Sequence, residues 1–458
     1  MVNLKGYRAE LVQQSSLSKV PIHADEYHAR HPDFGTLLAN EHSFFHVLFP
    51  EFTGHSEREL KPDLLASLRS QHYRLSDQKV IYLYKTNYRG KVTVSFIAGV
   101  SYKDYREKRI VQHEHYIPSK MNKIQEKTKV LETFTGFPMV CGVFPEELQK
   151  FLKGFAFVNP VQKISLKGVT HEVFALTQGE TDFVVKSFKK VDHLYIADGH
   201  HRFEAYSNVI ESIQDKPNLI EDFDHIPVAI YNMGEVDVLR FYRVVKNVCG
   251  SDEKSLSEFF KHVSDLFFVE EIFCTKLKGF LQKMMYAEPA DEIFNPISTL
   301  QTAVMFEGFP TIEQISRELE PVSKNQFSMY VSSLKKWFLL TSRKPMNSMN
   351  LVFLHNQFLS KFVGEGRPGS IEYYPETQGN CLFMMRMAES EGSTNIVLHS
   401  HKVEAREILY ASEHKEKLPP KSSLFYPKPL VGMIIRPLIV SDNKIKGEVP
   451  EGCMLIEI

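Results

Sequence analysis

The chain has 458 residues, of which 43% are hydrophobic and 24% charged, so it can bury one large core or two to three smaller ones. Its 55 Lys and Arg side chains are balanced by 56 Asp and Glu side chains, and the formal net charge of -1 excludes a global basic field for holding nucleic acid. Five cysteines without a CxxC pair argue against a disulfide framework and a thiolate zinc site, and favour the reducing cytoplasm.

The first 100 residues and the middle of the chain read as short strands with a few helices. Residues 76–100 predict two strands joined by a polar turn at Tyr88-Arg89-Gly90, because apolar and polar residues alternate there. A helix is expected from about Lys123 to Glu132. Between residues 138 and 200, apolar segments are spaced like the strands of a compact mixed sheet, namely FPMVCGVF, GFAFVNPV, HEVFALT, FVVKSF and HLYIAD.

The second half of the chain mixes helix and strand patterns. The stretch IPVAIYNM at 226–233 predicts another strand, and SLSEFFKHVSDLFFVEEI predicts a helix that leads into a strand. Residues 311–360 look mainly helical, and a helix is expected from Lys402 to Ala411. Pro419 and Pro420 then open an extended tail, and the single Trp337 is expected in the core. The whole pattern is that of an α+β protein.

No leader or membrane span is predicted. The chain begins MVNLKGYRAELVQQ, which lacks a charged start followed by an apolar core. No run of about 18 or more apolar residues occurs. We therefore expect a cytoplasmic protein that has no membrane partner.

One stretch, HLYIADGHHRFEAYSNVI from His193 to Ile210, places unusual polar chemistry at a predicted strand-to-helix turn. LYIA reads as a short buried strand, and the following residues carry an apolar helical face made of Phe203, Tyr206, Val209, Ile210 and Ile213. The sequence Asp198-Gly199-His200-His201-Arg202 therefore lies at a helix N-terminus. Such a terminus has N–H groups without intrahelical partners and a partial positive charge, which favour a bound phosphate.

The individual residues of the turn can be interpreted as parts of a phosphate site. Gly199 lets the backbone approach a ligand or adopt a positive φ, and Arg202 offers a planar fork that matches phosphate oxygens. Asp198 would be repelled by a phosphate unless it holds Mg²⁺, accepts a proton or hydroxyl from substrate, or caps the helix. An ordinary Asp-Gly helix cap is the alternative interpretation. A metal site made by His200 and His201 is not expected, because helix neighbours point about 100° apart.

The run ADGHHRFEAY is similar to the G-x-H-R motif of the ParB and sulfiredoxin fold, where this turn holds nucleotide phosphates. More specifically, the chain resembles domain-of-unknown-function family 1015 along most of its length. The matching stretches, in order, are VQHEHYIPSK with His113 and Glu114, YIADGHHRFEA, FYRVVK with Tyr242 and Arg243, and PPKSSLFYPKPLVG from Pro419 to Gly432.

Within the wider fold, the resemblance extends to ParB-like free serine kinases, which have a proposed glutamate base and a D-G-H-x-R phosphate turn. It implies that Glu114 is the catalytic base and that Asp198 is a second catalytic residue holding Mg²⁺. The implied nucleotide-binding residues, for ATP or ADP, are Gly199, His200, His201 and Arg202. Further candidates come from the residues themselves: Arg243 lies on one face of a predicted strand and points either into a charged cleft or to water, and Lys421 and Lys428 lie in an extended run that could fold over the nucleotide. For the two lysines the alternative is a stiff edge strand around Pro427 and Pro429.

The sequence departs from the family near the implied base. Family members continue HE-x-T-R, whereas Tyr116 and Ile117 stand here, which leaves the substrate open. A solvent-exposed charged loop is the alternative interpretation of His113 and Glu114. Sulfiredoxin-like thiol chemistry is not expected, because His200 occupies the position of the cysteine. DNA clamping is also not expected, because the segment after Arg202 is acidic.

These observations predict three regions and one activity. We expect an N-terminal α+β region over residues 1–105, a ParB/sulfiredoxin-like core over 106–250 and a C-terminal α+β region over 251–458. The expected activity is nucleotide-dependent phosphoryl transfer to or from a small molecule such as free serine, phosphoserine or a related hydroxy amino acid. The alternative is a non-catalytic nucleotide-binding regulator. The number of subunits and the role of residues 251–360 are not predicted.

Overall fold

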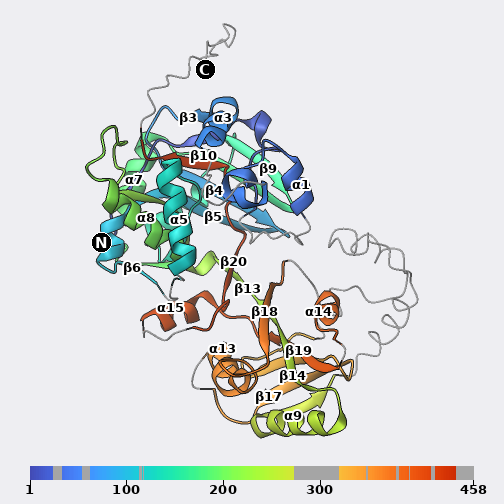
Figure 1. The fold of residues 1–458 in the computed structure, drawn as a ribbon. Helices are drawn as coiled ribbons and strands as arrows, with labels where there is room; N and C mark the ends of the chain where they lie inside the picture. The colour runs from blue at the N-terminus through green and yellow to red at the C-terminus, as the bar shows by residue number, and fades with distance from the viewer. Residues whose placement is uncertain are drawn as a thin grey trace, which may run out of the picture. The chain divides into compact units, whose positions relative to one another are not determined.

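The computed structural model describes residues 1–23, 33–53, 62–112, 116, 118–272, 319–346, 349–377, 381–390, 392–413 and 418–439. The chain forms two compact units, shown in Figure 1: a first unit of Met1–Glu235 with Pro427–Ile458, and a second unit of Val236–Tyr426. The chain leaves the first unit and returns to it, so this division differs from the three contiguous regions expected above. The reason is that strand β21 near the C-terminus pairs with strands from the N-terminal part of the chain.

The first unit is built on a mixed sheet with the order β6-β11-β8-β12-β5-β4-β10-β9, in which β1 also pairs with β5. Its strands are β1 (Leu4–Lys5), β4 (Tyr82–Tyr88), β5 (Lys91–Ser101), β6 (Ile110–Val111), β8 (Met139–Gly142), β9 (Gln162–Leu166), β10 (Val169–Ala175), β11 (Leu194–Asp198) and β12 (His225–Asn232). Strand β11 runs parallel to β6 and antiparallel to β8, and β8 runs parallel to β12.

A smaller sheet and several helices complete the first unit. The smaller sheet has the order β3-β2-β21-β7, with β2 (Glu10–Val12), β3 (Tyr73–Leu75), β7 (Thr133–Phe134) and β21 (Ile434–Pro437). The described helices are α1 (Phe34–Ala39), α2 (Phe45–Leu48), α3 (Pro62–His72), α4 (Tyr102–Arg106), α5 (Pro118–Leu131), α6 (Glu146–Gly154), α7 (Gln178–Phe188) and α8 (His200–Ile213).

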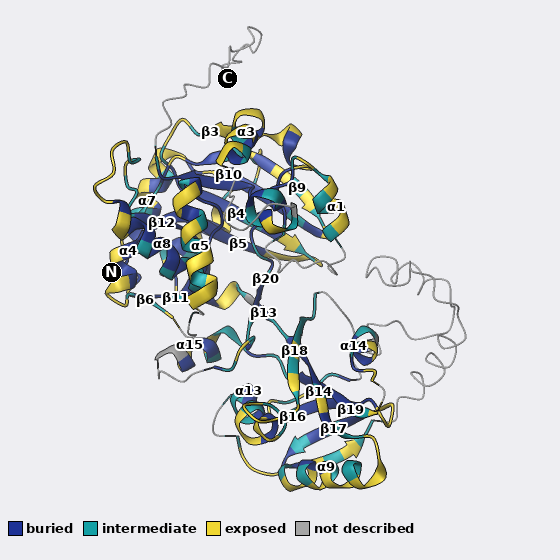
Figure 2. Cartoon of the chain, viewed as in Figure 1, coloured by how far each residue is buried: buried dark blue, intermediate teal, exposed yellow. Residues whose placement is uncertain are grey.

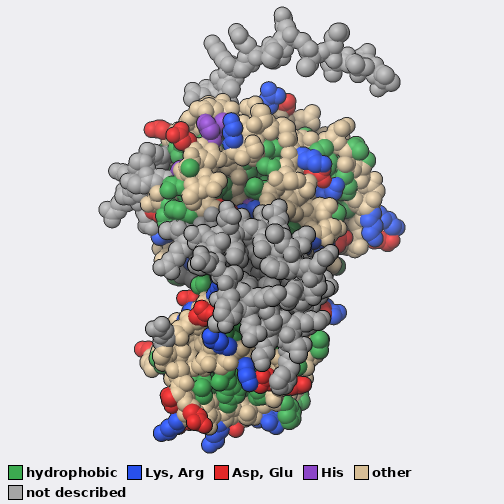
Figure 3. Space-filling view, turned by 90° about the vertical axis from the view of Figure 1, so that its right-hand side faces the viewer, with side chains coloured by type: hydrophobic (Ala, Val, Ile, Leu, Met, Phe, Trp, Pro, Cys, Tyr) green, Lys and Arg blue, Asp and Glu red, His purple; other side chains and the backbone are tan. Residues whose placement is uncertain are grey.

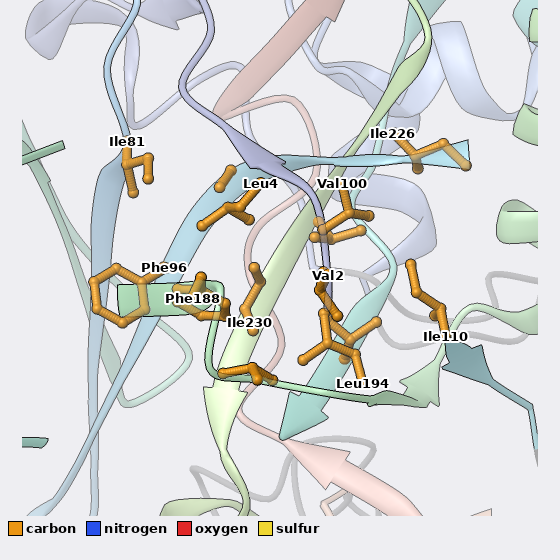
Figure 4. Close-up of a cluster of buried hydrophobic side chains, with 14 of the residues drawn as sticks. Val2, Leu4, Ile81, Phe96, Val100, Ile110, Phe188, Leu194, Ile226 and Ile230 are labelled. Carbon is orange, nitrogen blue, oxygen red and sulfur yellow. The ribbon is translucent and has the colours of Figure 1, made fainter. Parts of the chain in front are cut away.

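The core of the first unit lies on one face of the large sheet. Alternate residues of the central strands point to this face and pack against apolar residues of the helices, including Phe188 and Phe203. Figure 4 shows side chains of Phe96, Val100 and Ile230 in this cluster. All three are fully buried. Burial of this apolar surface is the main stabilising contribution in such a unit.

The second unit contains an antiparallel sheet with the order β15-β17-β16-β19-β14-β18 and a separate pair, β13-β20. Its strands are β13 (Asp237–Leu239), β14 (Phe241–Gly250), β15 (Phe267–Glu271), β16 (Gln326–Val331), β17 (Lys336–Ser342), β18 (Ser370–Pro375), β19 (Ser393–Ser400) and β20 (Leu424–Tyr426). Its described helices are α9 (Glu253–Leu266), α13 (Asn350–Phe353), α14 (Cys381–Met387) and α15 (Ala405–Glu413). In Figure 2 the central strands of each unit are buried, as expected for sheets covered by other elements.

The α+β prediction is confirmed, and most predicted elements are present. The hairpin is β4 and β5, and its turn residues Arg89 and Gly90 have φ values of 51° and 81°, as a type I′ turn requires. The predicted helical face of α8 is buried, with Tyr206 1% exposed and Val209 fully buried. Trp337 is a core residue with 3% of its surface exposed.

Three element predictions are wrong. The segment FVVKSF belongs to helix α7, which begins with a capping box formed by Thr177 and Glu180. No strand forms within residues 155–161, part of GFAFVNPV. Residues 326–342, expected to be helical, form strands β16 and β17, because their hydrophobic residues pack on both faces of the second unit's sheet.

The surface seen in Figure 3 carries positive and negative side chains of both units in an interspersed pattern. This arrangement agrees with the balanced composition of the chain. Within the described residues, no helix combines the length and the apolar character that crossing a bilayer would require.

Candidate functional site

The Asp198–Arg202 segment forms the predicted strand-to-helix turn in the first unit. Strand β11 ends at Asp198, Gly199 is the N-cap residue, and helix α8 begins at His200. The first helical hydrogen bond runs from Phe203 N–H to the Gly199 carbonyl at 3.0 Å, so the N–H groups of the preceding turn point out of the helix end. Gly199 has no side chain with which to cap the helix, so its part in the turn is played by the backbone alone.

Position 199 requires glycine for two reasons, its backbone conformation and its close neighbours. Its φ of 91° and ψ of 32° lie in the left-handed region that glycine favours. A methyl group on its Cα would lie 3.1 Å from Pro138 Cα and 3.3 Å from Pro138 Cβ. Pro138 precedes strand β8, which is paired with β11. The close approach of these two backbones therefore shapes the turn.

We expect Gly199→Ala to destabilise the first unit by about 1–3 kcal/mol, because alanine is strained at this φ and its Cβ is pressed against Pro138. Urea unfolding of the full chain, followed by circular dichroism, measures the loss. Gly168→Ala is the matched control, since Gly168 has a φ of 74° but an added Cβ would have no atom within 4 Å. Equal destabilisation by both variants would show that contact with Pro138 contributes nothing.

Asp198 is ion-paired with Lys428 of the C-terminal segment. The Lys428 Nζ donates to Asp198 Oδ1 at 2.7 Å, and the two side chains retain 20% and 32% of their exposure. Burial opposes ionisation of Asp198, but the charges of Lys428 and Arg202 and the hydrogen bond from Lys428 outweigh it and lower its pKa to about 2. Asp198 is therefore ionised at neutral pH and is a weak proton acceptor.

Arg202 lies on the first turn of α8 with its guanidinium beside Gly136. A methyl group at Gly136 would be 3.5 Å from Arg202 Cζ, which is an ordinary van der Waals distance, so the guanidinium lies directly beside this glycine. The loop is held in place by Tyr206, whose hydroxyl donates to the Gly136 carbonyl at 2.9 Å. Within the described part of the chain, the Arg202 guanidinium donates no hydrogen bond, although its charge acts on Asp198.

These groups line one pocket of the first unit. The pocket contains about 250 Å³ of space not filled by atoms, part of it open to solvent, and its lining residues are Phe137, Met139, Asp198, Arg202, Lys428, Pro429, Leu430 and Val431. Two cations and the first turn of α8 lie on its walls, and groups of this kind favour a small anion such as a phosphate group.

The two histidines of the turn differ in exposure. His200 is buried, with 5% of its surface exposed, and its charge interaction contributes to the lowered pKa of Asp198. His201 is only half-buried. Both lie in the first turn of α8, where a protonated or N–H-donating imidazole stabilises a nearby anion.

Arg243 and Lys421 belong to the second unit, where they contact each other. Arg243 is buried in β14, and its guanidinium donates to His355 Nε2 at 3.0 Å and to the carbonyls of Phe241 and Lys421, both at 3.1 Å. Burial lowers the pKa of Arg243 to about 10, partly offset by Tyr373. The Lys421 ammonium lies 5.6 Å from the centre of the Phe241 ring. Arg243 thus ties β14 to the loop of Lys421, and a phosphate-binding role for the two residues stays a prediction.

Glu114, the expected base, lies outside the described residues, as does His113. What the structure describes is the strand before them: β6 ends at Val111 and runs parallel to β11, with Val111 opposite Tyr195. Parallel neighbours end at the same edge of a sheet. The end of β6 and the end of β11, where Asp198 lies, are therefore at the same edge of the sheet.

Several pocket residues were not predicted from the sequence. Phe137 and Met139 line the pocket because β8 lies beside β11, and Gly136 lies beside the Arg202 guanidinium. The one available signal was the Gly-Phe-Pro sequence before a predicted strand. A cluster of Asp222, Asp224 and His225 has ligand atoms within 4.8 Å of one another, but Asp222 is hydrogen-bonded to Lys5 at 2.5 Å, which makes it part of a charge network.

A family model described as protein of unknown function (DUF1015) matches residues 27–360. No curated protein matches the chain.

Several solved structures are similar to the chain. C-terminally truncated SbnI from Staphylococcus aureus is 9% identical, with a TM-score of 0.33 over 74% of this chain and 87% of that chain. A conserved hypothetical protein from Pyrococcus furiosus is 13% identical, with a TM-score of 0.30 over 74% and 95%. A free serine kinase in complex with AMP is 14% identical, with a TM-score of 0.31 over 78% and 93%. Similarity at this level does not match individual residues.

Proposed function

The chain belongs to the family described as protein of unknown function (DUF1015), and on this premise we propose that its first unit binds nucleotide phosphates and transfers a phosphoryl group to or from a small hydroxyl compound. Free serine, or phosphoserine in the reverse direction, is the proposed substrate. The ParB/sulfiredoxin-like core and the cytoplasmic location are part of this proposal. The observation that carries it is the pocket in which Arg202, Lys428 and the N-terminus of α8 converge.

The electrostatics of the pocket support phosphate binding. Arg202 and Lys428 contribute two positive charges and Asp198 contributes one negative charge, so the pocket is cationic before a ligand enters. The helix N-terminus adds N–H donors and a partial positive charge. Phosphoryl transfer depends mainly on positioning and on charge stabilisation of this kind. His200 and His201 are proposed to act on the same anion.

In the proposed reaction, the substrate hydroxyl attacks the terminal phosphorus of ATP, its proton passes to Glu114, and the bond to the bridging oxygen breaks to release ADP. Support for Glu114 as base comes from the parallel pairing of β6 with β11. Because its pKa is about 2, Asp198 is better suited to binding a cation than to accepting the proton of the substrate. Mg²⁺ carried by the nucleotide would neutralise phosphate charge, and it requires only one or two protein carboxylates.

A non-catalytic nucleotide-binding regulator is the second candidate. It is favoured by the Asp198–Lys428 ion pair, because a carboxylate that is bonded to a lysine is less able to hold Mg²⁺. The two candidates differ in turnover. Purified protein is incubated with Mg²⁺, ATP or ADP and a panel of hydroxy amino acids, and phosphorylated products are measured. Nucleotide that raises the thermal stability without turnover of any panel member would establish the regulator.

We expect Arg202→Ala to weaken ADP binding by about 10- to 150-fold, the usual contribution of a hydrogen bond to a charged group. The reason is that Arg202 lines the pocket and donates to none of the described residues, so its donors are available to a phosphate. Isothermal titration calorimetry measures the affinity. Arg89→Ala is the control, because it removes the same charge from an exposed hairpin turn. An Arg202→Ala affinity equal to that of the control would exclude Arg202 from the site.

A further inference from the structure

A buried tyrosine of the large sheet holds the segment that carries Lys428. In the sequence Pro427-Lys428-Pro429-Leu430, proline has no N–H, so Leu430 supplies the first backbone N–H after Lys428 that can anchor the chain. This N–H donates to the Tyr84 hydroxyl at 3.0 Å. Leu430 is 2% exposed and Tyr84 is 1% exposed, so the hydrogen bond is shielded from water.

The Tyr84 hydroxyl is itself oriented from the neighbouring strand. Tyr84 lies in β4 between β5 and β10, and its oxygen is 3.1 Å from Nδ1 of His171 in β10. Met433 Sδ lies 3.5 Å from the same oxygen. Burial raises the pKa of Tyr84, and burial together with the charge of His23 lowers the pKa of His171 to about 3. At neutral pH the imidazole is therefore neutral, and the Tyr84 hydroxyl accepts from Leu430 N–H.

We infer that Tyr84 is a positioning residue of the phosphate pocket: it fixes Leu430, and through Leu430 it holds the Lys428 ammonium at Asp198. The inference rests on the proposed function and deepens it, because it names the residue that keeps the positive charge of Lys428 in the pocket. The next backbone N–H anchor is the residue that follows Leu430, where Val431 N–H donates to the Ile22 carbonyl at 2.8 Å. Without Tyr84, Lys428 would be followed by two residues that lack a backbone anchor.

A double-mutant cycle separates positioning from general stabilisation. ADP affinity is measured by calorimetry for the full-length wild type, Tyr84→Phe, Lys428→Met and the double variant. We expect Tyr84→Phe to lower the affinity about 3- to 10-fold in the wild type, the usual effect of one lost hydrogen bond. In the Lys428→Met background the same change should have less than about a twofold effect, because the group being positioned is already absent. Equal losses in both backgrounds would overturn the inference.

Tyr82→Phe is the matched control. Tyr82 is a fully buried tyrosine two residues earlier in the same strand, and within the described residues its hydroxyl makes no hydrogen bond. Its removal should leave ADP affinity within about twofold of the wild type, because this hydroxyl anchors no part of the pocket. A larger effect on affinity than that of Tyr84→Phe would show that any buried hydroxyl of this strand matters, and would also overturn the inference.

A measurement without ligand keeps the inference testable if the proposed function fails. Wild-type protein that binds neither ADP nor inorganic phosphate would exclude the proposed function. Crystal structures of Tyr84→Phe and Tyr82→Phe then give the separation of Lys428 Nζ and Asp198 Oδ1, which is 2.7 Å in the wild type. We expect this pair to separate in Tyr84→Phe and to stay bonded in Tyr82→Phe. An intact pair in Tyr84→Phe would show that Tyr84 does not position Lys428.

Discussion

Glu114→Gln is expected to lower phosphoryl transfer by about 100- to 10,000-fold, the range that a placed general base contributes. Glutamine has nearly the same shape as glutamate but cannot take the proton of the substrate hydroxyl. ADP affinity should stay nearly unchanged, because phosphate binding is assigned to Arg202, Lys428 and the helix N-terminus. Product formation under saturating nucleotide measures the first quantity, and calorimetry with ADP measures the second.

The control for this experiment is Glu126→Gln, which makes the same change at an exposed position of helix α5. It should leave both turnover and affinity at the wild-type level. Turnover of Glu114→Gln equal to that of the control would remove Glu114 from the role of base. A parallel loss of ADP affinity and turnover would instead place Glu114 among the binding groups.

The protein is expected to lose stability steeply below about pH 6.5, because several histidines are buried in the neutral form. Burial lowers the pKa of His171 and of His355 to about 3, with further lowering by the charges of His23 and Arg243 respectively. Both values lie below the unfolded value of about 6.5, so in acid the unfolded chain binds more protons. This contribution to stability is complete above pH 6.5 and is lost as the pH falls.

The expected loss of unfolding free energy in acid is large for both units. Each such histidine costs about 1.4 kcal/mol per pH unit between its folded and unfolded pKa, or about 2 kcal/mol between pH 7 and pH 5. The pKa values of His72 and His225 in the first unit, and of His399 in the second, are lowered in the same direction by burial. Both units should therefore unfold in mild acid.

The two units can be followed separately, because the single Trp337 lies in β17 of the second unit. Urea unfolding at pH 7 and pH 5, followed by tryptophan fluorescence and by circular dichroism, measures the loss in each. His355→Gln keeps an acceptor for the Arg243 Nε–H but cannot titrate, so it should reduce the pH dependence of the fluorescence transition. His193→Gln, at an exposed position, should not. Unfolding free energies that are the same at both pH values would contradict the prediction.

Local patterns predicted much of the fold and the centre of the site. The alternation in β4 and β5 and the helical spacing of α8 follow from backbone geometry, which is set by residues a few positions apart. The strand-to-helix turn at Asp198–Arg202 was recognisable for the same reason. Prediction failed at FVVKSF, where an apolar run was assigned to a strand although the capping residues Thr177 and Glu180 begin a helix.

The sequence by itself determined most elements of the chain and the position of the strand-to-helix turn, because both depend on neighbouring residues. The tertiary structure decided what surrounds the turn: Lys428 reaches Asp198 across 230 residues, and Gly136 and Pro138 face Arg202 and Gly199 because β8 pairs with β11. It also decided that Arg243 and Lys421 contact each other in the second unit. Such contacts depend on how strands and loops far apart in sequence pack together, which no local pattern records.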